Sequence, residues 1–281
     1  MVFSALATDK VNRCDTIRFD AAGKALSVSR VLSQLGKKSV HLTPLGGRLR
    51  PVFLDLCAAD GIEVQWVESS SEIRFCYTLV DKERRQVTEL VEEGDPAGEG
   101  AADRLLEAFD SLLPAALLLV ISGSRTAGLP DSLVPEMVRR AKEAGIYVIL
   151  DIRGADLVNS LPFRPDLVKP NLEEFAATFA EGNISREKIA VHCRELWERY
   201  GCQIVLTRGS RNLWYAETGT LEEFPVETAE ALNTTGSGDA FTAGLASALA
   251  DGAFLKEALA EASRCGRLNA LHLKPGTILE K

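Results

Sequence analysis

Four segments of the chain repeat one order of positions: apolar residues at helical spacing, then a glycine, then a short run of β-branched and aliphatic residues. The segments are residues 28–42, 49–67, 133–150 and 189–207. Glycine readily takes the left-handed conformation that ends many helices, so each of these glycines is predicted to end a helix. They are Gly36, Gly61, Gly145 and Gly201. Four such units predict an α/β fold, with a parallel sheet covered by helices on both faces.

One stretch interrupts this order. Residues 72–90 show two strand-like runs, with apolar residues alternating in the first, joined by a charged turn at residues 81–85. This pattern predicts an antiparallel hairpin inserted between the parallel units. With residues 11–19, the other candidate strand outside the repeated order, it could form a small sheet that closes over a ligand or pairs with a second subunit. The acidic, glycine-containing residues 91–102 are the expected hinge back into the main domain.

Composition narrows the class of protein. The 281 residues carry 32 Lys and Arg against 40 Asp and Glu, a formal net charge of −8. This balance argues against nucleic-acid and anionic-membrane binding, which need a concentrated basic face, and favours a small-molecule ligand. The longest apolar run, residues 112–121, is too short to span a bilayer, and no signal-peptide pattern is visible. We therefore expect a cytoplasmic protein.

The six cysteines and three histidines are scattered along the chain, without a CxxC pair or a histidine cluster. Such spacing is typical of buried or incidental thiols rather than of a zinc site or a disulfide framework. His192 and Cys193 are adjacent, but neighbouring helix residues point about 100° apart, and no second pair completes a metal site. The sequence therefore predicts no metal held by these residues.

The densest chemical signal is NTTGSGDAFTAGLASALADG, residues 233–252. Its GSGD turn opens an apolar helix, and glycines at a helix start expose backbone amides that form an anion-binding hole. Asp239 lies at the mouth of that hole; the alternative interpretation is a helix cap worth about 1 kcal/mol. Two commoner nucleotide motifs are excluded, because Phe241 stands where a dinucleotide fingerprint needs its third glycine and the chain contains no Walker A loop.

Five motifs in a fixed order give the chain a resemblance to the PfkB (ribokinase-like) carbohydrate kinases, especially the branch with 1-phosphofructokinase and tagatose-6-phosphate kinase. They are GKALSVSRVLSQLG, TELVEEG, VILDIRG, VKPNLEEF and NTTGSGD. This resemblance spans nearly the whole chain. It implies a ribokinase-like three-layer α/β/α sandwich with a mostly parallel sheet and a small antiparallel β lid. Residues 23–71 and 96–281 would form the kinase domain, and residues 1–22 and 72–95 the lid.

The resemblance also implies the catalytic and nucleotide-binding residues. Asp239 would be the catalytic base, and the backbone amides before it would hold the transferring phosphoryl group. These amides belong to Gly236, Ser237 and Gly238. Glu174 would help to hold Mg²⁺ indirectly, through the triphosphate, although alone it is typical of an acid favoured at a helix start. The implied ATP-binding residues are Asn171, Glu174, Thr207, Gly209 and Asn269.

On the acceptor side, the implied substrate-binding residues are Gly23, Lys24, Ser27 and Arg74. Lys24 and Arg74 would grip a phosphate already present on the substrate, since arginine offers a fork suited to phosphate and lysine a point charge. Without the resemblance, each of these two would be interpreted as a solvated basic side chain.

Departures from the family pattern are concentrated around the acceptor. The family's opening strand with NPAxD has no counterpart here, so we expect a gap or an irregular segment at its place in the sheet. GGKGxN reads AGKALS, in which Ser27 replaces an asparagine amide by a shorter hydroxyl. GSLPPG reads GSRTAG, with Arg125 adding a charge, and the nucleotide loop TRGSRN has Arg208 and Asn212 where Leu and Gly are usual. The identity of the acceptor is therefore left open.

Together these features predict an ATP- and Mg²⁺-dependent kinase that phosphorylates a hydroxyl of a sugar or sugar phosphate, as a homodimer joined through the lid. One alternative is a kinase for an unphosphorylated sugar or nucleoside. Another is a non-catalytic relative that senses a sugar phosphate or nucleotide, which the missing strand and the altered acceptor motifs favour. The intact NTTGSGD motif weighs against a sensor, because a sensor has no need of a base.

Overall fold

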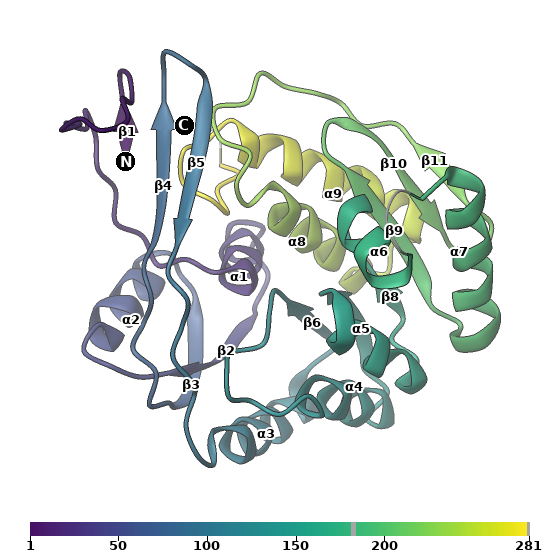
Figure 1. Ribbon diagram of the computed structural model, residues 1–281. Coiled ribbons are helices and arrows are strands. Elements are labelled where there is room, and N and C mark those ends of the chain that lie inside the picture. Colours follow the sequence, from purple (N-terminus) through teal and green to yellow (C-terminus); the bar gives the residue numbers. More distant parts are fainter. Residues whose placement is uncertain (181–183, 280–281) are drawn as a thin grey trace.

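The computed structural model describes residues 1–180 and 184–279, and it has a central sheet between two layers of helices (Figure 1). Six strands in the order β11-β10-β9-β8-β7-β6 form the main sheet. Their bounds are β6 (Leu118–Ser122), β7 (Tyr147–Asp151), β8 (Leu167–Val168), β9 (Gln203–Arg208), β10 (Arg211–Ala216) and β11 (Glu222–Phe224). β6 to β9 run parallel, whereas β10 and β11 are antiparallel additions at one edge. The predicted α/β fold with a mainly parallel sheet is confirmed.

Helices cover both faces of this sheet because successive strand residues point to opposite sides. Ile149 packs with α8 and α9, whereas its neighbours Val148 and Leu150 pack in the core beneath α4 to α7. One layer contains α1 (Lys24–Gln34), α2 (Arg50–Ala59), α8 (Ser237–Ala250) and α9 (Leu255–Ala270). The other contains α3 (Ala101–Leu112), α4 (Leu133–Glu143), α5 (Gly154–Ser160), α6 (Leu172–Phe179) and α7 (Arg186–Tyr200).

The helix-ending glycines behave as the sequence predicts. All four have a positive φ, between 68° and 74°, where a side chain would strain the backbone. They follow α1, α2, α4 and α7, and each leads into the next strand. This regular element of the sequence pattern is therefore confirmed by the backbone.

The sheet is interrupted where the missing opening strand predicts a gap. β2 (Val40–Leu45) and β3 (Glu63–Glu68) form a separate parallel pair. α1 contacts both β2 and β6, yet in the described part of the chain no ladder joins these two strands. The strand nearest the start of the chain, β1 (Val2–Phe3), pairs instead within the lid.

The lid sheet has the order β1-β4-β5, with β4 (Cys76–Asp81) antiparallel to β5 (Gln86–Val91). The predicted hairpin is confirmed, since Asp81 pairs with Gln86 across the expected turn. The expectation that residues 11–19 form a strand was wrong, because they make only a single bridge, between Thr16 and Val2. Val11 is 88% exposed, so this segment lacks the packing partners that stabilise a half-buried strand.

Candidate active site

The GSGD turn begins α8, which packs against α9 (Figure 1). Gly236 has φ 82°, and a Cβ there would lie 2.8 Å from Cβ of Pro275, so both the conformation and the space require glycine. Ser237 N donates to Thr234 O at 3.1 Å within the turn. The amides of Gly236 and Gly238 donate to no acceptor among the described residues, as is usual at a helix start. This turn can therefore accept an anion.

Asn269 on α9 holds this turn in place. It is fully buried, and its Nδ2 donates to Thr235 O at 2.9 Å and to Ser237 Oγ at 3.1 Å. Its Oδ1 accepts from Gly276 N at 2.6 Å. Because these bonds occupy both ends of the amide, the side chain in this structure supports the anion-binding turn. The adenine-side contact expected of Asn269 stays a prediction.

Asp239 lies in the first turn of α8 and is 9% exposed. Burial and the neighbouring carboxylate of Asp151 raise its pKa to about 7, against the opposing effect of Lys169 and Lys24. Glu174 adds a weaker upward effect. A carboxylate with a pKa near neutrality can accept a proton from a hydroxyl and release it again at physiological pH.

Two residues that the sequence analysis did not single out lie beneath Asp239. Asp151 ends β7 and Lys169 follows β8, and their side chains form an ion pair at 3.2 Å with 3% exposure each. Thr242 Oγ1, on α8, donates to Asp151 Oδ2 at 2.8 Å. The carboxyl ends of neighbouring parallel strands meet at one sheet edge. The signal that could have identified both residues was therefore their position at the ends of strand-like runs, in VILD and in VKPN.

Asn171 and Glu174 form a capping box at the start of α6. Asn171 Oδ1 accepts from Glu174 N at 2.8 Å, and Glu174 Oε2 accepts from Asn171 N at 3.0 Å. The other carboxylate oxygen, Oε1, lies 3.4 Å from Lys24 Nζ. Burial favours a higher pKa for Glu174, but the Asn171 amide, Lys24 and Lys169 together hold it below its usual value. The residue is thus a helix cap and an ionised member of the site at once.

Lys24, at the start of α1, faces this acidic group from the other side. Burial favours a lower pKa for its ammonium, but Asp151, Glu174 and Asp239 together raise it. Lys24 therefore stays charged in a site that presents carboxylates from β7, α6 and α8. The structure brings it together with the predicted base and the predicted Mg²⁺-associated carboxylate.

Thr207 and Gly209 lie where β9 ends and turns into β10. Thr207 forms a parallel bridge with Asn171, and its amide donates to Pro170 O at 3.3 Å. Gly209 has φ 64°, which favours glycine at this turn. These predicted nucleotide residues therefore adjoin the α6 capping box.

The remaining predicted acceptor residues are more dispersed. Gly23 immediately precedes α1. Ser27 is 3% exposed, and its backbone lies close to Gly276, so that a Cβ on Gly276 would come within 3.1 Å of it. Arg74 lies just before β4 in the lid, where it pairs with Glu93 at 3.9 Å. In the described part of the chain, no hydrogen bond or ion pair joins Arg74 to the Asp239 group. The charge that Arg125 adds is neutralised, since it pairs with Asp131 and with Asp156.

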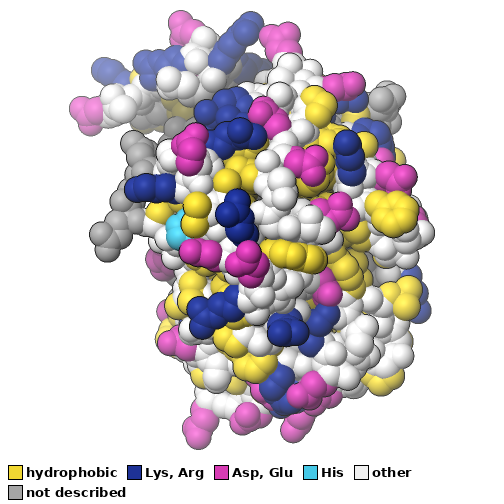
Figure 2. Space-filling model, turned by 90° about the vertical axis from the view of Figure 1, so that its right-hand side faces the viewer, with side chains coloured by type: hydrophobic (Ala, Val, Ile, Leu, Met, Phe, Trp, Pro, Cys, Tyr) yellow, Lys and Arg dark blue, Asp and Glu magenta, His cyan; other side chains and the backbone are white. Residues whose placement is uncertain are grey.

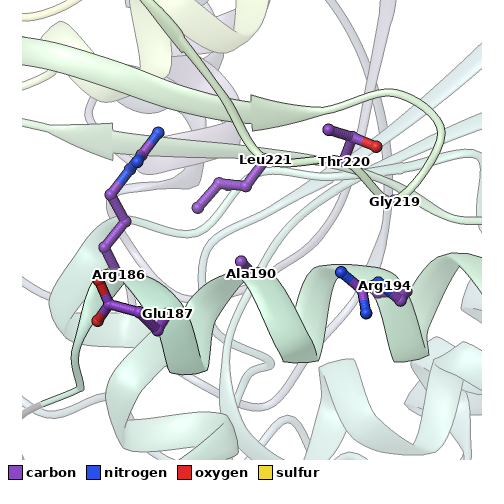
Figure 3. A pocket seen from close by; sticks show the side chains of 7 residues that line it. All are labelled: Arg186, Glu187, Ala190, Arg194, Gly219, Thr220 and Leu221. Carbon is purple, nitrogen blue, oxygen red and sulfur yellow. The ribbon is translucent and has the colours of Figure 1, made fainter.

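The other surface features described below do not combine buried and charged side chains as the surroundings of Asp239 do. A depression of about 250 Å³ lies between α7 and the β10–β11 turn, with exposed Arg186, Glu187 and Arg194 on its helical side (Figure 3). On the face that includes this region, acidic and basic side chains are interspersed (Figure 2). In residues 1–180 and 184–279, no cluster of three His, Cys, Asp or Glu side chains is placed to hold a metal ion. No described helix combines the length and apolar character needed to cross a membrane.

Solved structures show where this fold occurs. The chain superposes on phosphofructokinase-2 from Escherichia coli with a TM-score of 0.87 and 21% identity, covering 97% of this chain and 89% of that one. A protein described as "possible 1-phosphofructokinase", from Thermotoga maritima, gives a TM-score of 0.88 at 20% identity, covering 98% and 88%. Arabidopsis thaliana ribokinase gives 0.74 at 18% identity, covering 98% and 89%. At these identities the likeness establishes the ribokinase-like fold.

Comparison of the sequence with family models identifies the family as well as the fold. The profile of the pfkB family carbohydrate kinases matches residues 2–281, nearly the full length, including the strand ends and the α8 turn that form the site. The chain belongs to the pfkB family of carbohydrate kinases.

Proposed function

We propose that this kinase transfers the γ-phosphoryl group of ATP to a hydroxyl of a sugar phosphate, with Asp239 as the base. The observation that carries the proposal is a carboxylate with a pKa near 7, 9% exposed, in the same helix turn as the unpaired amides of Gly236 and Gly238. Proton acceptance and anion binding are the two tasks of phosphoryl transfer, and this turn offers both.

In the proposed reaction, Asp239 takes up the proton that the acceptor hydroxyl loses. The acceptor oxygen forms a bond to the γ-phosphorus, the bond from that phosphorus to the bridging oxygen of ADP breaks, and the acceptor's proton passes to the Asp239 carboxylate. The amides of Gly236 and Gly238 would stabilise the charge on the transferring group. Ser237 would contribute less through its amide, because that N–H already donates to Thr234 O.

The residues at the α6 start fit a Mg²⁺-bound triphosphate. Glu174 Oε1 is not used by the capping box, and a carboxylate oxygen is a donor that Mg²⁺ prefers. Glu174 would hold the ion indirectly, with Asn171, Thr207 and Gly209 lining the nucleotide side. When bound, Mg²⁺ neutralises phosphate charge. Lys24, now paired with Glu174, is close enough to this group to contact an anionic substrate instead.

For the acceptor we propose a phosphorylated sugar, held by Lys24 and Arg74 with Gly23 and Ser27 nearby. Thr235 Oγ1 donates to Glu89 Oε1 at 3.0 Å, so one face of the lid is turned toward the α8 turn. Side chains alternate along an extended chain, which puts Arg74 on the side opposite Phe75 and therefore toward the kinase domain. Closure of residues 1–22 and 72–95 would bring Arg74 to the substrate. A neighbouring structure of Escherichia coli phosphofructokinase-2 is a complex with fructose-6-phosphate.

The deciding experiment is an ADP-release assay across hexoses, pentoses, their phosphates and nucleosides. Release only in the presence of a sugar phosphate supports the proposal, whereas turnover of a neutral sugar or nucleoside supports the alternative acceptor. Absence of release with every acceptor would favour the sensing role. Arg74→Ala should raise KM for the phosphorylated acceptor at least about tenfold, because a charged hydrogen bond to phosphate is lost. The control Arg85→Ala removes an arginine of the lid turn and should leave KM unchanged.

We also propose that two copies associate through the outer face of the lid. Tyr77 lies opposite Leu90 in the β4–β5 ladder, on the face away from Glu89, and the two are 41% and 53% exposed. Phe75 stacks on Tyr77 at 5.9 Å and contacts Phe19 at 6.3 Å, which extends this apolar face. Exposed aromatic and aliphatic side chains on a sheet mark an association surface. Light scattering that shows twice the mass of the 281-residue chain would support the dimer, and a monomer at micromolar concentration would contradict it.

A further inference from the structure

Lys169 is a buried lysine with no assigned role in the transfer. Its side chain is 3% exposed, its ammonium lies 3.2 Å from Asp151 Oδ1, and the Phe241 ring is 6.0 Å away. A charged group removed from water to this degree costs several kcal/mol in general, unless a partner and hydrogen bonds compensate. Two apolar side chains could fill the same space without this cost, so packing alone does not explain the ion pair. Its location beneath Asp239 suggests a role at the site.

Asp151 connects three elements. It accepts from Lys169, from Thr242 Oγ1 on α8 at 2.8 Å, and from Ser122 Oγ at the end of β6 at 3.4 Å. A cation and two hydroxyl donors around one carboxylate fix its position and orientation. Asp151 is therefore a carboxylate held in one place at the sheet edge.

Thr242 connects the Asp151 carboxylate to the first turn of α8. It lies three residues after Asp239, one helical turn away, and its hydroxyl is also 3.0 Å from Gly238 O. The bond from Thr242 to Asp151 thus ties the turn that carries the base and the anion-accepting amides to the ends of β7 and β8. A shift of this turn by an ångström would misplace both.

The charged groups that face Asp239 come from four elements. Asp151 at the end of β7 and Glu174 on α6 are like charges, whereas Lys169 after β8 and Lys24 on α1 are opposite charges. Lys24 and Glu174 pair with each other, and Lys169 and Asp151 do the same. Of the two carboxylates, Asp151 raises the pKa of Asp239 more than Glu174 does.

We propose that Lys169, Asp151 and Thr242 are positioning residues that fix the first turn of α8 and set the pH range over which Asp239 accepts a proton. The inference rests on the proposed function, because it takes Asp239 as the base. Lys169 holds the Asp151 carboxylate through the ion pair, Asp151 repels a negative charge on Asp239, and Thr242 fixes the position of one carboxylate relative to the other. None of the three is required to touch either substrate.

The sign of the effect follows from the charges. Replacing Asp151 by asparagine removes the repulsion and leaves Lys169 as an unpaired cation, and both changes lower the pKa of Asp239. The acid limb of kcat/KM against pH, where the base becomes protonated, should therefore move to lower pH by about one unit. In the double variant Asp151→Asn with Lys169→Met both charges are gone, so the limb should lie between that of the single variant and that of the wild type.

The experiment measures the pH profile of kcat/KM with the best acceptor from the panel, for the full-length wild type and each variant. Thr242→Val should lower kcat about tenfold, and Thr242→Ser, which keeps the hydroxyl, should restore it. Ser247→Ala, a buried hydroxyl further along α8, is the matched control and should leave the profile unchanged. An acid limb of Asp151→Asn at or above the wild-type pH would overturn the proposal.

Folding is checked by circular dichroism and apparent Tm, because breaking a buried pair destabilises a protein strongly. If Asp151→Asn does not fold, the double variant and the Thr242 variants decide the matter. A double variant with its limb at the wild-type pH, or a Thr242→Val variant with wild-type kcat, would overturn the proposal. Asp239→Asn is measured alongside: full activity there would refute the proposed function itself, whereas an inactive Asp239→Asn with unmoved limbs refutes only this inference.

Discussion

Asp239 in the first turn of α8 is 9% exposed and faces charged groups from four elements, whereas all six residues of the lid strand β5 are exposed. At the α8 turn, buried hydrogen bonds from Asn269 and Thr242 fix the backbone. In the lid, the ion pair of Arg74 with Glu93 spans 3.9 Å between side chains that are 43% and 95% exposed. Water screens such a pair, so it constrains little.

Under the proposed function, the α8 turn and the lid contribute to one reaction in different ways. A base and an anion hole must be held in place before the substrate arrives, because their contribution depends on position. The lid arginine that we propose to bind the phosphate of the substrate would have to move to admit the substrate, so a loosely held position suits it. The same substitution should therefore have a large effect near α8 and a small one in the lid.

The largest effect is expected at Asp239, the proposed base. Asp239→Asn keeps the shape of the side chain but removes its ability to accept a proton, which should lower kcat about 10³-fold. Nucleotide binding should change little, because the asparagine leaves the turn and the α6 cap intact. Single-turnover phosphoryl transfer and equilibrium ATP binding measure the two quantities separately. Turnover within tenfold of the wild type would remove Asp239 from the mechanism.

The same substitution should alter how stability depends on pH. Asp239 has a pKa near 7 in the folded protein and an ordinary value near 4 when unfolded, so its protonated form favours the folded state. This contribution is complete below about pH 4 and is lost as the pH rises through 7. Asp239→Asn should therefore gain stability relative to the wild type between pH 5 and pH 8, on the order of 2 to 3 kcal/mol.

Apparent Tm at pH 5 and pH 8, for the wild type and Asp239→Asn side by side, checks this prediction. The difference between variant and wild type should be larger at pH 8 by several degrees. An equal difference at both values would show that Asp239 is ionised in the folded protein throughout this range.

The packing that supports the α8 turn should be nearly as sensitive. A Cβ on Gly244 would lie 2.9 Å from Cα of Ala262 on α9, a contact that only a shift of the backbone can relieve. Gly244→Val is expected to cost about 2 to 3 kcal/mol through overpacking and to lower Tm by roughly 5 to 10 °C. Ala250→Val, on the exposed end of α8, is the matched control and should cost a few tenths of a kcal/mol. Comparable losses in the two variants would contradict this account of the helix contact.

The smallest effect on folding is expected in the lid. Tyr77→Lys with Leu90→Lys should change the stability of each protomer by less than about 1 kcal/mol in total, because both side chains are exposed. The same pair should convert a dimer into a monomer, since it places charges on the apolar outer face. Val91→Lys, on the opposite face of β5, is the control and should leave the mass unchanged. Light scattering distinguishes them, and a dimer that survives the double substitution places the interface elsewhere.

Local patterns predicted most of the fold. The positive φ angles of Gly36, Gly61, Gly145 and Gly201 and the Asp81–Gln86 turn depend on residues close in sequence, and the structure confirms them. The strand expected at residues 11–19 was wrong, because β-propensity without a packing partner does not make a strand. The remaining strand of the lid sheet, β1 (Val2–Phe3), has only two residues, which is too short to recognise from a hydrophobic pattern.

The candidate site divides in the same way. The GSGD turn and the segment from Asn171 to Glu174 each span four consecutive residues, so the anion-accepting turn and an acid at a helix start could be predicted. Lys169 and Asp151 could not be paired from the sequence, because each alone is an ordinary charged residue at a strand end. Asn269 could be assigned to the site but not to its actual contacts, which come from residues more than thirty positions away and from a loop beyond α9.

The sequence by itself determined the four helix–glycine–strand units, the hairpin, the anion-accepting turn and the family, because each depends on periodicity or on a contiguous motif. Only the tertiary structure decided the electrostatics. It places Asp151, Lys169, Lys24 and Glu174 around Asp239 from four elements, and burial then determines how strongly these charges interact. The physical reason is that a pKa depends on distance and dielectric environment, neither of which exists until separate elements pack together.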